Sequence, residues 1–387
     1  MTIWSAVLAR AWWMAWKPSQ NCCTRQTSID WIRRKLYQHQ LEHAMRWFHQ
    51  HPFLATTLLL AAALLLSVAI GPVFIPPGIA AQLLLAKLPG ASLSITWPET
   101  YEAILLQIRL PHAALMALTG AALAGSGAAY QGLFRNPLAD PYLIGVASGA
   151  GLGAVLALAI RWPGTLLGLY TVPASAFLGA ALTILVVYSL ARVGRAVPTT
   201  TLILAGVAFS SFATSLTSFL MLRSNTELRR ALAWLLGGAI MNGWEPVWAM
   251  LPYVALGLGV LSISGHALNV LQFGEEQAQQ LGMSIERIKL GLVLAASLTT
   301  AAAVAFSGII GFIGLIVPHV IRMTWGPDYR RLIPLSVLGG GSALLLADLL
   351  ARVVLAPQTL PVGIVTALAG APFFLWVLRR SKTQAYW

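Results

Sequence analysis

The sequence predicts an all-α polytopic membrane protein with about ten transmembrane helices. Hydrophobic residues make up 58% of the 387 residues and charged residues only 10%, whereas a soluble globular domain carries about 25% charged residues. The mean hydropathy is +0.75. Apolar stretches of about 20 residues, the length that crosses a bilayer as a helix, recur along the whole chain. The length suits one integral membrane domain, predicted at 53–387, with little mass outside the membrane.

The positive charge is distributed as in a membrane protein. The net charge of +13 could suggest a nucleic-acid-binding protein, but most Lys and Arg flank apolar segments, where they orient helices in a bilayer. With a cytoplasmic N-terminus, 18 of the 25 Lys and Arg fall on the cytoplasmic side, and the bias persists at 11 to 7 without the N-terminal tail. We therefore expect both termini in the cytoplasm, membrane lipid as a partner and no nucleic acid.

The first 52 residues form a separate region of different composition. We predict a basic, Trp- and His-rich extension at 1–52, cytoplasmic or interfacial, with a basic helix over Ser28–Gln50 along the membrane surface or the bundle. The first long apolar run starts near Phe53, too far along the chain for a signal peptide. His39 and His43 leave a metal site open, although solvated histidines are the preferred interpretation, and no metal site is predicted.

Ten spans follow the extension. They are expected at Phe53–Phe74, Ala103–Tyr130, Pro141–Ile160, Leu167–Ala191, Leu202–Leu222, Trp244–Ser264, Ile288–Phe306, Ile309–Trp325, Leu332–Leu355 and Val362–Leu378. The second is long enough to tilt or to protrude. The eighth is short and contains Pro318, which predicts a broken or kinked helix.

A polar insert, His266–Lys289, separates the sixth and seventh spans. Gly274 precedes a run of good helix formers with two acidic residues in its first turn, where the helix dipole favours them. Gly282 follows where a left-handed C-cap is expected, and Ser284 offers an N-cap for the next helix. The insert fits either a docking element for a soluble partner or a solvated loop between helices, and composition alone favours the loop.

Few ionisable residues lie within the spans. Asp348 and Arg352 are four residues apart near the outer end of the ninth span, and Arg109 stands at the outer start of the second. Such groups are costly in a membrane unless they are paired or near water. Two interpretations stay open: an internal ion pair with a snorkelling Arg109, or outward-facing cations that meet an acidic partner.

Motifs of common enzymes are absent from the sequence. It contains no GxxxxGK[ST] phosphate loop, no HExxH and no GxSxG. We therefore expect a protein that is not an enzyme and has no ATPase site of its own.

Several long motifs carry a family resemblance. The segment Arg109–Gly153 reads RLPHAALMALTGAALAGSGAAYQGLFRNPLADPYLIGVASGAGLG. It resembles the iron-complex/cobalamin permease family of ABC importers (FecCD/BtuC type), whose pattern has an RLPR start, a Q-x-L-F-x-NPLA-DP turn and a GVxxGA helix. From Trp234 onward, WLLGG, FGEEQAQQLG, GFIGLIVPHVIR, GPDYRRLIPLS, ADLLAR and LPVGIVTALAGAPFF match in the family's order. The resemblance covers about Phe53 to Arg380.

The resemblance implies a permease subunit of a binding-protein-dependent importer in the bacterial plasma (inner) membrane. Its implied partners are a separate cytoplasmic ABC ATPase, an extracytoplasmic substrate-binding protein and a second permease copy in a homodimer. It implies import of a chelated metal complex, ferric siderophore first and then cobalamin or haem, with no cofactor of its own. The alternative is an ion-gradient-driven secondary transporter, for which intramembrane acids would be expected; the main candidate is Asp348.

The resemblance also assigns three groups of site residues. The insert becomes the element that couples the permease to the ATPase, with Gly274, Glu275, Glu276, Gln277, Gln280 and Gly282. The cytoplasmic gate matches Asn136, Leu138, Thr200 and Thr201. Binding-protein docking matches Arg109 and Arg352, together with His112 in place of the family's second Arg.

Overall fold

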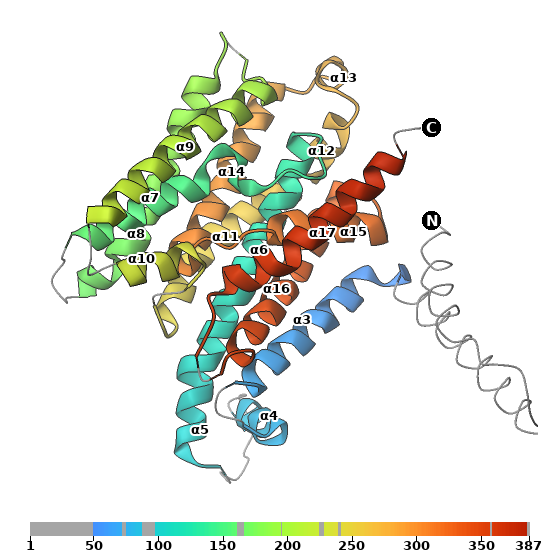
Figure 1. Cartoon of the computed structure of the whole chain (residues 1–387). Helices are drawn as coiled ribbons and strands as arrows, with labels where there is room; N and C mark the ends of the chain where they lie inside the picture. Colours follow the sequence, from blue (N-terminus) through green and yellow to red (C-terminus); the bar gives the residue numbers. More distant parts are fainter. Residues whose placement is uncertain are drawn as a thin grey trace, which may run out of the picture. The chain divides into compact units, whose positions relative to one another are not determined.

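The computed structural model describes residues 49–71, 75–86, 97–160, 166–194, 196–223, 228–238, 241–356 and 358–384. The chain divides into two units at His51, and the second unit, Pro52–Trp387, holds nearly all of the described residues. The predictions made for the extension at 1–52 lie almost entirely outside the described residues. Within them the chain is helical and contains no β-strand (Figure 1).

Ten apolar helices form the bundle within the described residues. They are α3 Pro52–Ala69, the continuous helix α5–η1–α6 (Glu99–Leu133), α7 Val146–Ala159, α8 Leu166–Ala191, α9 Thr199–Arg223, α11 Glu245–Ile263, α14 Ile285–Ser307, α15 Ile313–Trp325, α16 Tyr329–Val353 and α17 Val362–Gln384. Eight are long and apolar enough to cross a membrane, and α7 and α15 are shorter apolar helices. The predicted fold class is confirmed, and each predicted span coincides with one of these helices.

Short helices connect the long ones. They are α4 Pro77–Ala86, the 3-10 turn η2 Pro141–Ile144, α10 Leu228–Leu235, α12 Gly265–Leu271 and α13 Glu275–Gln280. Hydropathy did not predict α4, α10 or α12. In α10 the amphipathic pattern is local: Arg229 and Arg230 are exposed, whereas Trp234 is fully buried. Figure 1 shows α13 and α5 at opposite ends of the bundle, which we call the α13 end and the α5 end.

The long second helix changes its pitch once. Its turn η1, Ile104–Arg109, is a π-helix in which the Leu110 amide bonds to the Leu105 carbonyl. The adjacent Pro111 has no N–H to donate, and a π-turn accommodates this loss without breaking the helix. The carbonyl of Leu106 accepts a hydrogen bond of 3.1 Å from the indole of Trp244 instead. The helix therefore continues unbroken through a proline.

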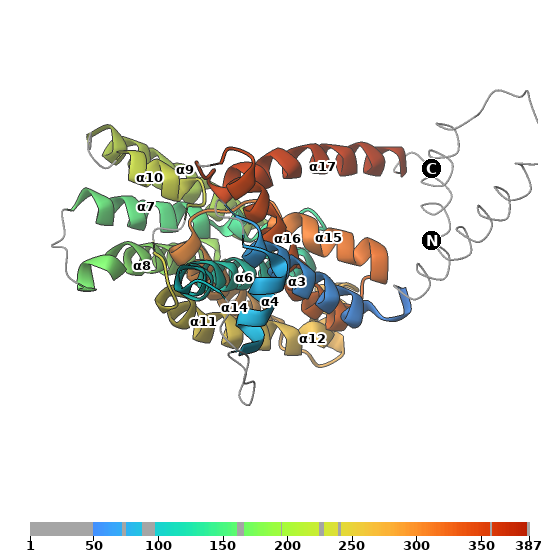
Figure 2. The same cartoon turned by 90° about the horizontal axis from the view of Figure 1, so that it is seen from below.

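The helix α6, Leu110–Leu133, lies in the middle of the bundle in both views (Figures 1 and 2) and contacts α16, α14, α15 and α11. In the apolar 18-residue stretch of each helix, 83% of the residues are buried for the helix that contains α6, against 22% for α9 and 17% for α17. A Cβ on Gly120 would lie 2.2 Å from the Gly340 carbonyl oxygen in α16, and one on Gly127 would lie 1.9 Å from that of Gly314 in α15. Glycine is required there because the helix backbones touch.

The helix α15 is continuous from Ile313 to Trp325 with Pro318 inside it, so of the predicted break or kink at Pro318 the break does not occur. Pro318 cannot donate to the Gly314 carbonyl one turn earlier. The buried amide of Gln131 in α6 lies there instead, with its Nε2 3.5 Å from the Gly314 oxygen and 3.1 Å from that of Leu315. A polar side chain from the neighbouring helix thus replaces the missing backbone donor, as bundles in lipid require.

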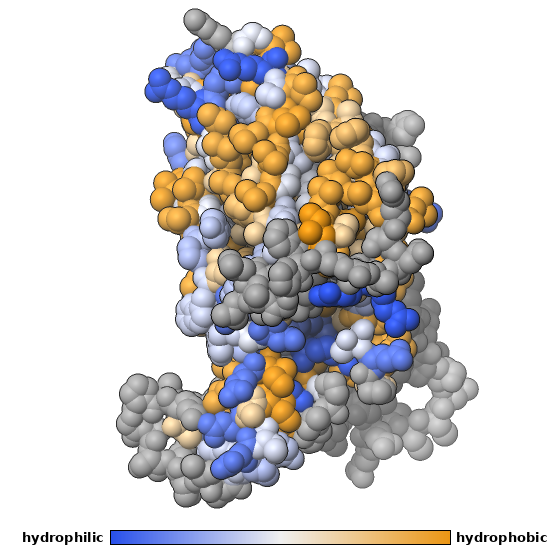
Figure 3. All heavy atoms as spheres, turned by 90° about the vertical axis from the view of Figure 1, so that its left-hand side faces the viewer, coloured by the Kyte–Doolittle hydropathy of each residue, from blue (hydrophilic) through white to orange (hydrophobic). Residues whose placement is uncertain are grey.

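Apolar side chains also gather on the outer surface. The face over α8 and α9 carries a band of hydrophobic residues bounded above by hydrophilic ones (Figure 3). Leu182 in α8, Phe212 in α9 and Leu368 in α17 are each more than half exposed. This pattern is that of a protein surrounded by lipid or by another apolar surface.

Replacing Gly127 by alanine is expected to lower the thermal unfolding midpoint in detergent. The new Cβ meets the backbone of α15, and overpacking of this kind costs about 1–3 kcal/mol. The matched control is Gly291→Ala in α14, where a Cβ meets nothing within 4 Å. That variant should unfold at the wild-type temperature or above, because alanine favours a helix over glycine. Equal midpoints for the two variants would contradict the close packing.

Candidate functional site

The polar insert folds as two short helices at the α13 end. Gly274 is the N-cap of α13 with φ of 120°, and Gly282 follows its last turn with φ of 84°. The amide of Gly282 bonds to the Gln279 carbonyl at 2.9 Å, and that of Met283 bonds to the Ala278 carbonyl at 3.1 Å. The predicted left-handed C-cap at Gly282 is therefore confirmed. Ser284 does lie at the N-cap of α14, but its side chain makes no capping hydrogen bond, contrary to the prediction.

The helix α13 exposes a mixed surface. Glu276, Gln277 and Gln280 point to solvent, whereas Ala278 is buried. Two large apolar side chains flank the polar ones: Phe273 is 74% exposed and Leu281 is 71% exposed. Sequence reasoning did not single out this pair, although two apolar residues at the ends of a polar run are a usable signal. Exposed apolar groups with a polar surround are typical of a docking surface.

The preceding helix α12 fixes this insert to the bundle. Gln272 donates from Nε2 to the Gly132 carbonyl in α6 at 2.9 Å. Asn269 donates to the Asp328 carboxylate at 2.6 Å and accepts from the Tyr329 amide at 2.9 Å, which joins α12 to the start of α16. The hydrogen bond from Asn269 holds the pKa of Asp328 below its usual range. The insert is therefore tied to the two helices that pack most closely in the core.

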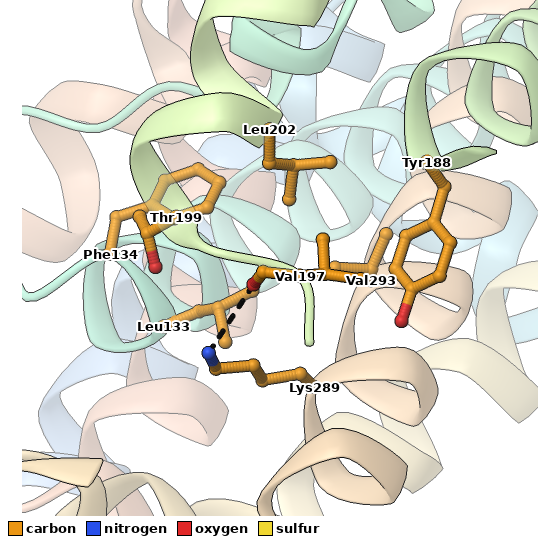
Figure 4. A pocket seen from close by; sticks show the side chains of 8 residues that line it. All are labelled: Leu133, Phe134, Tyr188, Val197, Thr199, Leu202, Lys289 and Val293. Carbon is orange, nitrogen blue, oxygen red and sulfur yellow. Dashed lines mark hydrogen bonds between the residues drawn. The ribbon is translucent and has the colours of Figure 1, made fainter. Parts of the chain in front are cut away.

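One predicted coupling residue points inward. Glu275 Oε2 lies 2.7 Å from Lys289 Nζ in α14, and the same ammonium lies 3.4 Å from the carbonyl oxygen of Val197, two residues before α9. Lys289 is only 6% exposed. It lies in a pocket at the ends of four helices (Figure 4), lined by Leu133, Phe134, Tyr188, Val197, Thr199, Leu202, Lys289 and Val293.

The predicted gate residues occupy two turns at the α13 end. Asn136 is exposed and accepts a hydrogen bond of 2.9 Å from the amide of Leu138, which forms a tight turn after α6. Thr200 is exposed, and Thr201 donates to the carbonyls of Ala191 and Pro198, each at 2.9 Å. The bond between Asn136 and Leu138 stays within one turn, whereas Thr201 also ties the start of α9 to the end of α8. Their neighbours Phe134 and Thr199 share the Lys289 pocket.

The three predicted docking residues come together at the α5 end. Arg109 donates to the carbonyls of Val68 and Ala69 at 2.9 and 3.1 Å. Arg352 donates to the carbonyl and the hydroxyl of Ser67 at 3.1 and 2.8 Å. Both guanidinium groups thus cap the C-terminus of α3, where unpaired carbonyls and the helix dipole favour cations. Arg109 is 6% exposed and does not snorkel to the surface.

A single buried acid completes this cluster. Asp348 lies 2.9 Å from Arg352 Nε and 2.9 Å from His112 Nε2. Of the two interpretations left open, the structure shows the internal ion pair between Asp348 and Arg352, and it adds His112 as a second partner. The His112 side chain is 30% exposed, more than either arginine. Among the described residues, no group of three or more His, Cys, Asp or Glu is placed to hold a metal ion.

Comparison with known proteins defines the class: a multi-pass permease subunit of an ABC importer of the metal-chelate, cobalamin or haem type. The chain belongs to the FecCD transport family, whose sequence model matches residues 59–380. The family resemblance stated from the motifs is therefore confirmed.

Three relatives illustrate the breadth of the family. The cobalamin import system permease protein BtuC of Halobacterium salinarum is 43% identical over 342 residues, 86% of this chain and 91% of the relative. The hemin transport system permease protein HmuU of Yersinia pestis is 41% identical over 288 residues, 73% and 84% of the two chains. An inward-facing structure described as a metal-chelate type ABC transporter is 30% identical, with a TM-score of 0.71 over 86% of this chain and 99% of that chain.

Replacing Arg109 by methionine is expected to destabilise the protein. The change removes a charged donor that satisfies two carbonyls at the end of α3, and hydrogen bonds to charged groups contribute about 1.5–3 kcal/mol each. Thermal unfolding in detergent measures the effect. The control Arg229→Met changes an exposed arginine on α10 and should leave the midpoint unchanged. An unchanged midpoint for Arg109→Met would show that the cap does not stabilise α3.

Proposed function

We propose that this chain is the transmembrane subunit of an importer that brings a chelated metal complex into the cytoplasm. ATP hydrolysis by a separate cytoplasmic subunit powers the movement. The chain spans the bacterial plasma (inner) membrane, with both termini and α13 on the cytoplasmic side. The excess of Lys and Arg on that side supports this orientation.

The observation that carries the proposal is the exposed helix α13 at one end of the bundle. It presents Phe273, Leu281 and three polar side chains to solvent, while α12 binds it to α6 and α16. A loop that only reverses the chain needs neither the apolar pair nor those anchors. A soluble partner that binds here can therefore exert force on the core of the bundle.

The other predicted site residues have places that agree with this function. Asn136 and Leu138 follow α6, and Thr200 and Thr201 lie in the first turn of α9; these helix ends lie at the α13 end in Figure 1, which supports the role of a cytoplasmic gate. At the α5 end, Arg109 and Arg352 are engaged with α3, so we assign them the role of holding the surface on which the binding protein docks. His112, more exposed than either arginine, would make the direct contact.

A second copy of the chain would cover the least buried helices. The spans of α9 and α17 are only 22% and 17% buried, and both carry large exposed apolar side chains. In a homodimer these faces would meet and enclose a pathway between the subunits.

The substrate is expected to be bound as a whole chelate. The described residues hold no cluster able to take a metal from its chelator. We propose a ferric siderophore as the first candidate. Cobalamin is the second, favoured by the 43% identity to a relative named for cobalamin import, and haem is the third.

The gradient-driven alternative has less support. Its main candidate, Asp348, is 2% exposed and paired with both Arg352 and His112. A proton- or ion-carrying acid needs access to water from each side in turn, and this carboxylate already has two cationic or ring-nitrogen partners.

The test of the proposal is purification followed by uptake. The tagged chain, purified from its native membrane in mild detergent, should bring a stoichiometric ATPase with it. Vesicles that contain the complex and its binding protein should then transport one of the three chelates. This transport should require ATP on the side of the membrane that carries the ATPase. Uptake driven by an imposed ion gradient in ATP-free vesicles would replace this proposal with the alternative.

The double variant Phe273→Ala with Leu281→Ala is expected to weaken ATPase binding about tenfold or more, because interface anchors cost upwards of about 1 kcal/mol each when truncated. Binding to immobilised permease measures the loss. Leu256→Ala is the matched control: that side chain is 73% exposed on α11, away from α13, and its removal should not change the affinity. Equal affinities for the double variant and the wild type would exclude this surface as the ATPase contact.

A further inference from the structure

Lys289 is a buried cation whose position the proposed function does not yet explain. It lies in the second turn of α14, and its side chain is 7% exposed. A buried ammonium is costly unless it is paired and hydrogen-bonded. Here the Glu275 carboxylate in α13 pairs with it at 2.7 Å, and the Val197 carbonyl oxygen lies at 3.4 Å on the other side. The side chain therefore bridges two segments that are far apart in sequence.

The two bridged segments are α13 and the turn that leads into α9. Val197 and Pro198 lead directly into Thr199, the first residue of α9, and the gate positions Thr200 and Thr201 follow. On its other side the first turn of α9 is held by the bond from Thr201 to the Ala191 carbonyl at the end of α8. Figure 4 shows the Lys289 ammonium beneath the Val197 carbonyl, with Thr199 and Leu202 of α9 beside the same pocket.

The remaining attachments of the insert lead elsewhere. Gln272 and Asn269 bind it to the ends of α6 and α16, which belong to the tightly packed core. Lys289 instead reaches a helix that is largely exposed. The contacts of α12 lead to the closely packed helices α6 and α16, whereas the contact of Lys289 leads to the less buried helix α9. A displacement of α13 can therefore move the start of α9 with respect to the core.

We propose that Lys289 is a positioning residue that transmits movement of α13 to the first turn of α9, and so to the gate. The inference rests on the proposed function, in which the ATPase moves α13. In this proposal Glu275 moves with α13, Lys289 follows through the ion pair, and the hydrogen bond from Lys289 to the Val197 carbonyl moves the start of α9. Glu275 is thereby a transmitting residue rather than one that contacts the ATPase through its carboxylate.

The exposure of the pair favours such a role. The Glu275 side chain is 43% exposed, so water screens the ion pair in the free subunit. A partner seated on α13 would exclude that water and strengthen the attraction between the two charges. The link is then firmest when the ATPase is bound, which is the state that must transmit force.

The experiment measures solute transported per ATP hydrolysed in vesicles that hold the full importer. Lys289→Met removes the charge and keeps an unbranched side chain of similar length. We expect its ATPase binding to stay within about twofold of wild type, while transport per ATP falls about fivefold or more, the lower range of measured coupling between sites. Arg287→Met, an exposed cation two residues earlier, is the control and should keep the wild-type ratio.

The partner variant tests whether the two residues act as one unit. Glu275→Gln should lower the ratio in the same direction, and the double variant Glu275→Gln with Lys289→Met should be no worse than the single Lys289→Met. If Lys289→Met fails to fold, as judged by its unfolding midpoint, the ratio in Glu275→Gln decides the question. If the fall in transport per ATP in the double variant equals the product of the falls in the two single variants, the two residues act independently, and the proposal that this pair transmits the movement is overturned.

The outcomes separate this inference from the function on which it rests. A wild-type chain that binds no ATPase and moves no chelate overturns the proposed function, and the inference with it. A wild-type importer that works, together with Lys289→Met at the wild-type ratio of transport to ATP, overturns the inference alone. A ratio that falls while ATPase binding also falls tenfold would assign Lys289 to docking and likewise overturn it.

Discussion

The close approach of α6 to its neighbours is the constraint on which the rest of the bundle depends. Gly120 and Gly127 bring the α6 backbone into contact with α16 and α15, at separations that no side chain would permit. In lipid the hydrophobic effect does not drive apolar helices together, so close packing and hydrogen bonds must hold the bundle. Because α6 is fixed in this way, its two ends are fixed as well. Arg109, just before its first residue, caps α3, and the Gly132 carbonyl near its last residue accepts the hydrogen bond from Gln272 that anchors α12.

Polar groups inside the bundle serve the ends and interruptions of helices. Gln131 supplies the donor that Pro318 removes from α15, and the indole of Trp244 bonds to a carbonyl beside the π-turn before Pro111. Arg109 and Arg352 satisfy the last carbonyls of α3. These groups are expensive in a membrane, and each one is placed where the backbone has lost a partner. The two arginines within the spans, Arg109 and Arg352, thus have backbone partners inside the bundle.

The sequence was sufficient for the long helices and for the class of protein, and insufficient for the short helices α4, α10 and α12 and for contacts between distant residues. Apolar length predicts each span, and the glycines on either side of α13 predict its caps, because both signals are local. The amphipathic helix α10 was not predicted because eight residues are too few to give a hydropathy signal. The partners of Arg109 and Glu275 lie 40 and 14 positions away. Such pairs depend on how helices pack, and nothing in a single sequence records that. Ser284 illustrates the converse: a residue of the right type at an N-cap makes no capping bond.

The distribution of burial supports the proposed transmission of movement from α13 to the start of α9. The core around α6 has little freedom, since its backbones already touch. The helices α9 and α17 have few buried residues and can shift against that core at lower cost, because packed interiors resist deformation whereas lightly covered surfaces do not. An importer of this kind needs only two packings whose balance a partner can tilt. The described part of the chain holds a closely packed core, the less buried helix α9, and an ion pair between α13 and α14 whose ammonium also contacts the Val197 carbonyl before α9. These three features would be sufficient for the transmission proposed above.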